Sequence, residues 1–460
     1  MILAGFAVPH PPMIVPAVGR GSEEQVKETT LAYEQAAKEI AQMEPETILI
    51  TSPHAVMYAD YFSISSGKGA RGSFASFRAA QVSFAETYDQ ELVDEICMLA
   101  DAEDFPAGTL GQTQKELDHG TMVPLWFVRN LYQKGKIVRI GLSGLPLTDH
   151  YRLGKIIKEA TDRLNRRVVW IASGDLSHKL QDYGPYGFSP EGPAYDKKIM
   201  DVLGRAAFGE LFDFSEEFCN KAAECGHRSF VIMAGAFDGM KVKATALSHQ
   251  DITGVGYGIC TFYPEGEDPD RHFLAAYLKE QKEKADNINQ TADAYVRLAK
   301  QSLTSYILEG KTIPVPEGLP DEMINERAGA FVSIHKLGRL RGCIGTILPV
   351  TGSLAEEIIE NAISASTRDP RFPAITADEL PWLEINVDVL GAAEDISSAD
   401  ELDVRRYGVI VTSGRKRGLL LPDLEGVDTV EQQISIAMQK AGIRKGEKIR
   451  LQRFEVIRHK

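Results

Sequence analysis

The chain has 460 residues, a formal net charge of −14, and ordinary shares of hydrophobic (43%) and charged (25%) residues, so it is long enough for two or three domains. The acidic balance and the lack of a lysine- and arginine-rich stripe argue against nucleic acid as a partner, and no apolar run approaches the roughly 18 residues that span a bilayer. Its five scattered cysteines include no CxxC pair, which fits a reducing cytoplasm better than a disulfide scaffold.

Strands and helices alternate over the first part of the chain. Short apolar runs predict strands at 2–8, 47–51, 136–141, 168–172 and 254–262. Helical spacing predicts helices between them, at 22–42, 89–99, 123–131, 149–164 and 194–206. The Gly- and Ser-rich stretch 61–77 is expected to hold paired strands and a surface loop. This alternation predicts an α/β domain with three αβα layers, in which helices cover both faces of a mostly parallel sheet.

An acidic stretch with Pro and Gly at 264–270 marks the end of this domain. We therefore expect a first domain over 1–264, a linker over 265–284 and a second, smaller α+β domain over 285–460. The second domain contains predicted helices at 292–309 and 354–367, predicted strands at 329–334 and 383–390, and a terminal helix and strand.

Four histidines have proline or glycine among their close neighbours, and three of them close a predicted strand. They are His10 in Pro9-His10-Pro11-Pro12, His54 in Ser52-Pro53-His54, His119 in Asp118-His119-Gly120, and His178 in Gly174-Asp175-Leu176-Ser177-His178. Open α/β sheets bind ligands at the carboxyl ends of their strands, so we expect these imidazoles to share one pocket. Neutral imidazole is the commonest metal ligand, and two histidines with one carboxylate leave open positions on Fe(II). The sequence thus predicts a metal site with His10 and His54 as its natural pair.

The order of these motifs resembles the catalytic-subunit domain of class III extradiol ring-cleaving dioxygenases, and it is similar to the related Memo family, over about residues 1–264. The resemblance implies that His10 and His54 bind Fe(II), that His178 is the acid/base and that His119 assists in the pocket. The implied substrate is a catechol-type aromatic diol, whose proton a histidine of near-neutral pKa can accept and return. Asp175 either orients the ring of His178 or serves as a turn or cap residue.

The third metal ligand is open between two neighbours. The dioxygenases use a glutamate in the corresponding late region, whereas Memo proteins have a cysteine, and this chain carries Glu224 beside Cys225. Adjacent residues face different ways, so both are not expected to bind one ion. We favour Glu224, because a hard oxygen ligand suits an O2-active Fe(II), while Cys225 matches the Memo pattern.

The second domain carries the run Leu340-Arg341-Gly342-Cys343-Ile344-Gly345, which is the signature of the AMMECR family. The stretch 366–373 is similar to the second motif of that family. Nearby arginines favour a nucleophilic thiolate at Cys343, so Arg341 and Cys343 form a candidate site. The alternative is that Cys343 is a small strand residue between turn glycines. Fusions of these two domains resemble a system that includes a radical-SAM protein, which implies such a partner.

Two main functional hypotheses follow. The first is a non-haem Fe(II) extradiol dioxygenase, an oxidoreductase acting on a catechol-type aromatic. The second is a non-catalytic Memo-like protein that binds a metal and a protein partner such as a radical-SAM protein. A zinc-dependent hydrolase is a third reading, because histidine-rich sites also suit Zn(II).

Overall fold

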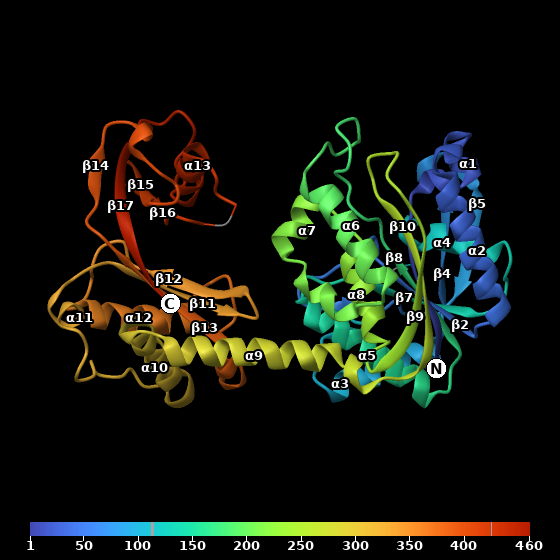
Figure 1. Cartoon of the computed structure of the whole chain (residues 1–460), viewed down its shortest axis with the longest axis horizontal. Helices are drawn as coiled ribbons and strands as arrows, with labels where there is room; N and C mark the ends of the chain where they lie inside the picture. Colours follow the sequence, from blue (N-terminus) through green and yellow to red (C-terminus); the bar gives the residue numbers. More distant parts are fainter. Residues whose placement is uncertain (112–114, 425) are drawn as a thin grey trace. The chain divides into compact units, whose positions relative to one another are not determined.

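The chain folds into two compact units, Met1–Tyr277 and Leu278–Lys460, and the division falls within helix α9 (Phe273–Thr291). A computed structural model describes residues 1–111, 115–424 and 426–460 (Figure 1). The expected linker over 265–284 contains the end of strand β10 and the first part of α9, so regular structure runs through it. Within the described residues, no helix has the length and apolar character needed to cross a membrane.

A six-stranded sheet forms the centre of the first unit, in the order β7-β2-β8-β1-β10-β9. Its strands are β1 (Ile2–Val8), β2 (Thr47–Ser52), β7 (Lys136–Gly141), β8 (Val168–Ser173), β9 (Met240–Gln250) and β10 (Tyr257–Glu267). The neighbours β7, β2, β8 and β1 are parallel, whereas β10 and β9 are antiparallel to their neighbours. The predicted α/β class with a mostly parallel sheet is therefore confirmed.

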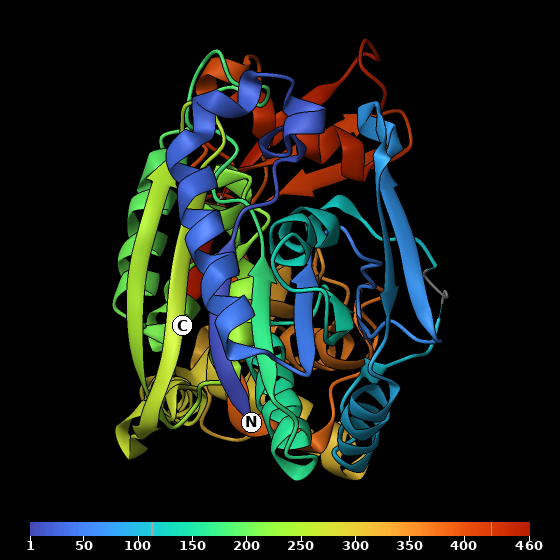
Figure 2. The same ribbon diagram turned by 90° about the vertical axis from the view of Figure 1, so that its right-hand side faces the viewer.

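Helices cover both faces of this sheet, because β2 and β8 are buried at every position and must be shielded from water on both sides. Figure 1 shows α2 and α4 on one side and α5 and α8 on the other, and Figure 2 shows α2 lying along its face. The helices are α1 (Pro16–Gly19), α2 (Lys27–Met43), α3 (Gln90–Ala102), α4 (His119–Arg129), α5 (Leu147–Arg163), α6 (Glu191–Gly204), α7 (Glu216–Ala222) and α8 (His227–Gly235). Gly154 and Gly235 allow α5 and α8 to touch, since an added Cβ at either would lie 1.9 Å from a carbonyl oxygen of the other helix.

Three local features differ from the sequence expectations. The strands β3 (Phe62–Ser63) and β4 (Gly69–Phe74) do not pair with each other: β3 pairs with β6 (Ala107–Gly108), and β4 pairs with β5 (Ala79–Thr87). Strand β9 was not predicted, because its alternation of half-buried and exposed positions gives no continuous apolar run. Helix α4 begins at His119 itself, so this histidine lies in the first helical turn.

The second unit contains a seven-stranded sheet with the path β12-β11-β13-β17-β15-β16, and β14 pairs with β17. Its strands are β11 (Ala330–Lys336), β12 (Arg339–Gly345), β13 (Leu383–Leu390), β14 (Glu394–Ile396), β15 (Tyr407–Ser413), β16 (Lys416–Leu420) and β17 (Arg450–His459). Its helices are α10 (Ala294–Glu309), α11 (Asp321–Asn325), α12 (Leu354–Thr367) and α13 (Val430–Lys440). Helices α10 and α12 pack on β11 and β13 through one apolar core, and α13 covers β15 and β16 through another.

Candidate metal centre

Three of the four histidines meet at the carboxyl edge of the parallel strands. His10 follows β1, His54 follows β2 and His119 starts α4, and their ligand atoms all lie within 4.8 Å of one another. The Nε2 atoms of His10 and His54 are 3.0 Å apart, and the ring centroids of His54 and His119 are 3.9 Å apart. His10 is buried, His119 is half-buried and His54 is exposed, so the group opens to solvent on the side of His54.

A serine fixes the proton position on His10. The hydroxyl of Ser173 donates to the carbonyl of Gly120 at 2.6 Å, so its oxygen must accept a hydrogen bond from Nδ1 of His10, 3.0 Å away. The proton of the neutral ring is then on Nδ1, and Nε2 carries a free lone pair directed at the group. This is the tautomer that a metal ligand requires, and sequence reasoning did not single out Ser173.

A buried ion pair positions the other two histidines. Asp118 caps α4 by accepting from the backbone N–H of Thr121, and it also accepts from the hydroxyl of Ser52, whose oxygen in turn accepts from the N–H of His54. The fully buried Arg139 donates to Asp118 at 3.2 Å. Burial opposes the charge of Asp118, but these hydrogen bonds and the charge of Arg139 outweigh it and lower the pKa of the carboxyl. One carboxylate thus holds both the end of β2 and the start of α4.

A second group shares His10. Its ring, Asp175 and Cys225 have ligand atoms within 4.8 Å of one another, and Cys225 Sγ lies 3.6 Å from Nε2 of His10. Asp175 accepts from the backbone N–H of His10 at 2.7 Å, and its own N–H donates to Cys225 Sγ at 3.2 Å. Gly174 and Gly226 permit this approach, because an added Cβ on Gly174 would lie 2.1 Å from the Cα of Gly226.

Glu224 lies outside both groups. Its carboxylate accepts from the N–H of His227 at 2.6 Å, at the start of α8, and burial raises its pKa to about 7. The side chains of Glu224 and Cys225 point in different directions, as expected for neighbours, and Cys225 is the one that faces His10. The geometry therefore favours Cys225 over Glu224, although ligand hardness favours Glu224.

His178 is oriented by a backbone carbonyl. Its Nδ1 is hydrogen-bonded to the carbonyl oxygen of Ala223, which can only accept, so the proton of the neutral ring is on Nδ1 and Nε2 is free to act as a base. The carbonyl of Ala223 bonds Nδ1 of this ring, while Asp175 accepts from the backbone N–H of His10. The ring of Tyr186 stands edge-on to His178 with centroids 5.1 Å apart.

In the second unit, the structure brings the two sequence motifs together. The backbone N–H of Cys343 donates to Asp369 at 2.9 Å, and Arg371 donates to the carbonyl of Cys343 at 3.1 Å. Arg341 donates from two nitrogens to Glu379 and from a third to the carbonyl of Pro373. The guanidinium of Arg341 is therefore engaged in holding the two motifs together.

The comparisons with known proteins agree with this architecture. A sequence model of the family described as the catalytic LigB subunit of aromatic ring-opening dioxygenase matches residues 4–260, and a model of AMMECR1 matches residues 296–459. The chain belongs to the LigB family and carries an AMMECR1 domain. The two resemblances read from the sequence motifs are thus confirmed.

Relatives match either the whole chain or one part of it. The chain is 42% identical over 469 residues to protein CA_C1420 of Clostridium acetobutylicum, with 100% of both chains covered. A protein of Thermotoga maritima is 50% identical over 36% of this chain and 97% of its own length. Among solved structures, the uncharacterized protein PH0010 from Pyrococcus horikoshii aligns with 30% identity and a TM-score of 0.35, covering 37% of this chain and 91% of that one.

The donor set of the LigB domain fits a divalent transition metal. Burial lowers the pKa of His10 to about 3 and that of His119 to about 4, and neighbouring imidazoles add to both shifts, so these rings are neutral at pH 7. Burial also raises the pKa values of Asp175 and Cys225, which disfavours their anionic forms unless a cation lies beside them. Neutral imidazoles beside a thiol and a carboxyl suit Fe(II) or Zn(II).

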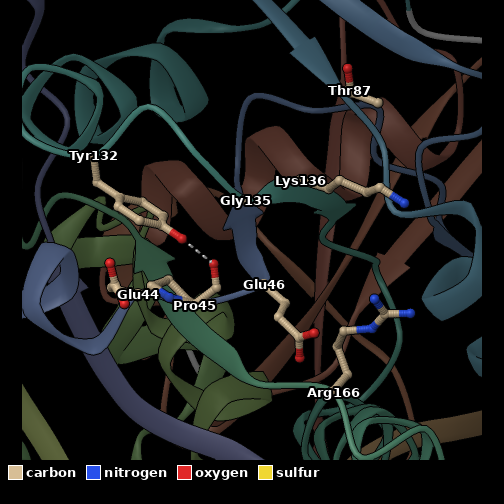
Figure 3. Close-up of a pocket in the computed structure, with 8 residues that line it drawn as sticks. All are labelled: Glu44, Pro45, Glu46, Thr87, Tyr132, Gly135, Lys136 and Arg166. Atoms are coloured by element: carbon tan, nitrogen blue, oxygen red, sulfur yellow. Dashed lines mark hydrogen bonds between the residues drawn. The ribbon is translucent and has the colours of Figure 1, made fainter.

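A separate hollow of about 600 Å³ lies at the other edge of the sheet, beside the starts of β2 and β7 (Figure 3). It is lined by Glu44, Pro45, Glu46, Thr87, Tyr132, Gly135, Lys136 and Arg166. The hydroxyl of Tyr132 donates to the carbonyl of Pro45 across it, and its charged residues are of both signs. His54 lies beyond the opposite end of β2, so this hollow is not part of the metal centre.

Proposed function

We propose that the LigB domain binds Fe(II) and cleaves the ring of a catechol-type aromatic with O2. The observation that carries this proposal is the unprotonated Nε2 of His10, in the tautomer that the hydrogen bond to Ser173 fixes. This nitrogen lies 3.0 Å from Nε2 of His54 and 3.6 Å from Sγ of Cys225. His10, His54 and Cys225 would hold the metal. An Fe(II) bound there supplies open positions for a diol and for O2 and mediates electron transfer between them.

The remaining residues of the site transfer protons or hold the metal-binding residues in place. His178, with Nε2 free, accepts a proton from a substrate hydroxyl and returns it to the cleaved product. The ring of His119 lies 3.9 Å from that of His54 and 5.6 Å from that of Phe77, measured between ring centroids. Asp175 fixes the backbone of His10.

Single substitutions test the assignment of the third ligand. Cys225→Ser is expected to lose most bound Fe(II) or Zn(II), because it removes the thiolate next to His10. Glu224→Gln is the matched control one residue away and is expected to retain the metal, since an amide oxygen still accepts from His227. Metal content after dialysis gives the result, and metal loss in Glu224→Gln with retention in Cys225→Ser would reverse the assignment.

The activity is tested by loading the whole chain with Fe(II) anaerobically and measuring O2 uptake with a panel of catechols. Uptake with a yellow ring-opened product, abolished in His178→Ala but with the metal retained, is the expected result. A metal-loaded protein that consumes no O2 with any catechol would reject the dioxygenase proposal.

A second candidate function rests on Cys225. A thiolate in place of a carboxylate is the ligand pattern of Memo proteins, and it favours a metal-binding protein that works with a partner instead of cleaving catechols. We propose a radical-SAM protein as that partner. Co-elution of the two proteins, dependent on the metal and unaffected by His178→Ala, would support this candidate.

A further inference from the structure

A buried carboxylate holds the segment that carries His178. Asp196 on α6 is 2% exposed, and its Oδ2 accepts a hydrogen bond from Nε2 of His249 on β9 at 2.7 Å. Its Oδ1 accepts from the backbone N–H of Ser177, the residue before His178, at 2.8 Å. We call Asp196 and His249 the bracing pair. Neither residue belongs to the two groups of ligand atoms at the metal centre.

The segment 174–179 lies outside any helix or strand, so its backbone groups need partners from other elements. The N–H of Gly256, just before β10, donates to the carbonyl of Ser177 at 2.8 Å, and Ala222 at the end of α7 accepts from the N–H of His178 at 3.2 Å. The carboxylate of the bracing pair is the partner of the N–H of Ser177. Because Ser177 is fully buried, water does not replace this carboxylate as the acceptor.

The close approach of Asp196 depends on a glycine. An added Cβ at Gly256 would lie 2.0 Å from Oδ2 of Asp196, so no other residue fits there without moving the carboxylate. A carboxylate is unfavourable to bury without partners. Burial raises the pKa of Asp196, and the hydrogen bonds from His249 and Ser177 oppose that shift. The chain thus keeps a charged group that is unfavourable to bury directly against the residue that precedes His178.

Two neighbouring carbonyls link the position of Ser177 to the ring of His178. The hydroxyl of Ser177 donates to the carbonyl of Ala222 at 2.8 Å, and the same carbonyl accepts from the N–H of His178. The next carbonyl, that of Ala223, is bonded to Nδ1 of the His178 ring. A shift of Ser177 therefore moves His178 relative to Ala223 and weakens the hydrogen bond that fixes the tautomer of the ring.

We propose that Asp196 is a positioning residue for His178 and that His249 supports it in this role. Asp196 holds the segment so that Nδ1 of His178 stays on the carbonyl of Ala223 and Nε2 stays unprotonated, in the form that accepts the proton of a substrate hydroxyl. The acid/base role of Nε2 rests on the proposed function, whereas the position and tautomer of the ring do not. Asp196 acts through Ser177 and is not itself a catalytic residue.

A second carboxylate–histidine pair in the same unit provides a matched control. The side chain of Asp238, which follows α8, is 3% exposed, against 2% for the carboxylate of the bracing pair. Asp238 accepts from His272 at 3.0 Å and from Tyr151 and Lys155 at 2.9 Å. None of these partners belongs to the segment that carries His178. Asp238→Ala therefore removes an equally buried carboxylate without the proposed positioning role.

The first test observes the ring of His178 by NMR of the full chain, labelled with ¹⁵N-histidine, at an alkaline pH where the ring is neutral. Ring nitrogen shifts distinguish a proton on Nδ1 from one on Nε2, and His178→Gln assigns the signal. We expect only the Nδ1–H form in the unmodified chain and in Asp238→Ala, and a mixture of both tautomers in Asp196→Ala. His249→Leu, at a side chain that is already 36% exposed, should cause the same change to a smaller extent, with His272→Leu as its control.

The second test measures kinetics with catechol in the chain loaded with Fe(II). Asp196→Ala is expected to lower kcat by about 10- to 100-fold with KM and metal content unchanged, because the acid/base is misplaced but not removed. Asp196→Asn keeps an oxygen that accepts from the N–H of Ser177, so it should restore most of the rate and the single tautomer. Asp238→Ala should leave kcat unchanged.

Two results would overturn the proposal: a His178 ring that keeps the Nδ1–H form in both Asp196→Ala and His249→Leu, or the same change of tautomer in Asp238→Ala as in Asp196→Ala. An active chain whose kcat is unaffected by Asp196→Ala would overturn it as well. If the unmodified chain consumes no O2 with any catechol, the proposed function is rejected, and the NMR result alone decides on Asp196. If Asp196→Ala loses its cooperative melting transition, His249→Leu takes its place in both tests.

Discussion

The metal centre of the LigB domain and strand β12 of the AMMECR1 domain place cysteine in different environments. Cys225 is buried beside neutral imidazoles and a carboxyl, and burial raises its pKa well above the usual value. Cys343 is half-exposed, its sulfur accepts a hydrogen bond from Ser333, and Arg371 donates to its backbone carbonyl. The first thiol needs a metal cation to become anionic, whereas the second lies beside a hydroxyl donor and the guanidinium of Arg371.

This difference explains why the supporting residues also differ. In the LigB domain, hydrogen bonds that Ser173 and Asp118 accept fix the tautomer of His10 and the backbone near His54 and His119, so that neutral imidazole nitrogens gather at one site. In the AMMECR1 domain, ion pairs have this role: Arg341 on β12 pairs with Glu379 in the 3-10 helix Ala377–Trp382, and Arg371 pairs with Asp369. Substitutions at these supporting residues therefore test the hydrogen bonds of the LigB domain and the ion pairs of the AMMECR1 domain separately.

The largest effect is expected on the stability of the LigB domain. Asp118→Asn keeps an acceptor for the cap of α4 but leaves the buried guanidinium of Arg139 without this carboxylate, which destabilises the domain by about 3 kcal/mol. Chemical denaturation measures the change. Asp201→Asn, which removes an exposed ion pair with Arg205, is the control and is expected to have little effect. Equal effects of the two substitutions would contradict the assigned role of Asp118.

The next effect concerns metal affinity. His10 belongs to both groups of ligand atoms, so His10→Ala is expected to weaken Zn(II) binding by more than about 100-fold, beyond the range seen for supporting residues. Isothermal titration of the apo protein gives the affinity. His335→Ala removes an imidazole from the AMMECR1 domain and should leave it unchanged. Tight Zn(II) binding in His10→Ala would show that this cluster is not the metal site.

A smaller loss of metal affinity is expected when the ring of His10 is kept but its tautomer is no longer fixed. Ser173→Ala removes the acceptor for Nδ1 of His10, and metal affinity should fall by about 10- to 100-fold. Ser177→Ala deletes an equally buried hydroxyl four residues away, which donates to the carbonyl of Ala222, and should not change the affinity. The comparison isolates the proton position from the loss of a buried hydroxyl.

The smallest expected effect is on the stability of the AMMECR1 domain, and it tests the ion pairs of Glu379. Burial disfavours the charge of Glu379, but hydrogen bonds from Arg341 and Lys336 outweigh it and lower its pKa from 4.5 to about 2. A carboxyl whose pKa is lowered by folding stabilises the fold above the unfolded pKa and loses this contribution as the pH falls through about 2.

Glu379→Gln is therefore expected to destabilise the domain at pH 7 by about 1–2 kcal/mol, allowing for partial solvent screening. The difference from the unmodified chain should shrink as the pH falls from about 4.5 toward about 2. Thermal melts across this range, with the exposed Glu431→Gln as control, give the result. A stability difference that does not change with pH would show that the charge of the Glu379 carboxylate does not stabilise the domain.

The sequence determined the sheet and the place of the histidines, because both depend on local patterns. Apolar runs followed by Pro- and Gly-flanked histidines are enough to predict parallel strands whose carboxyl ends carry imidazoles, and β1, β2 and β8 follow that pattern. Strand β9 was missed, since a half-exposed edge strand has no such run.

Only the tertiary structure decided which side chains face one another. Cys225 is 215 residues from His10, and its direction relative to Glu224 depends on the turn between α7 and α8. The roles of Ser173 beside His10 and of Asp369 beside Cys343 likewise depend on contacts between distant segments. Local spacing fixes which residues share an element, but the direction of a side chain toward another element is set by how the elements pack.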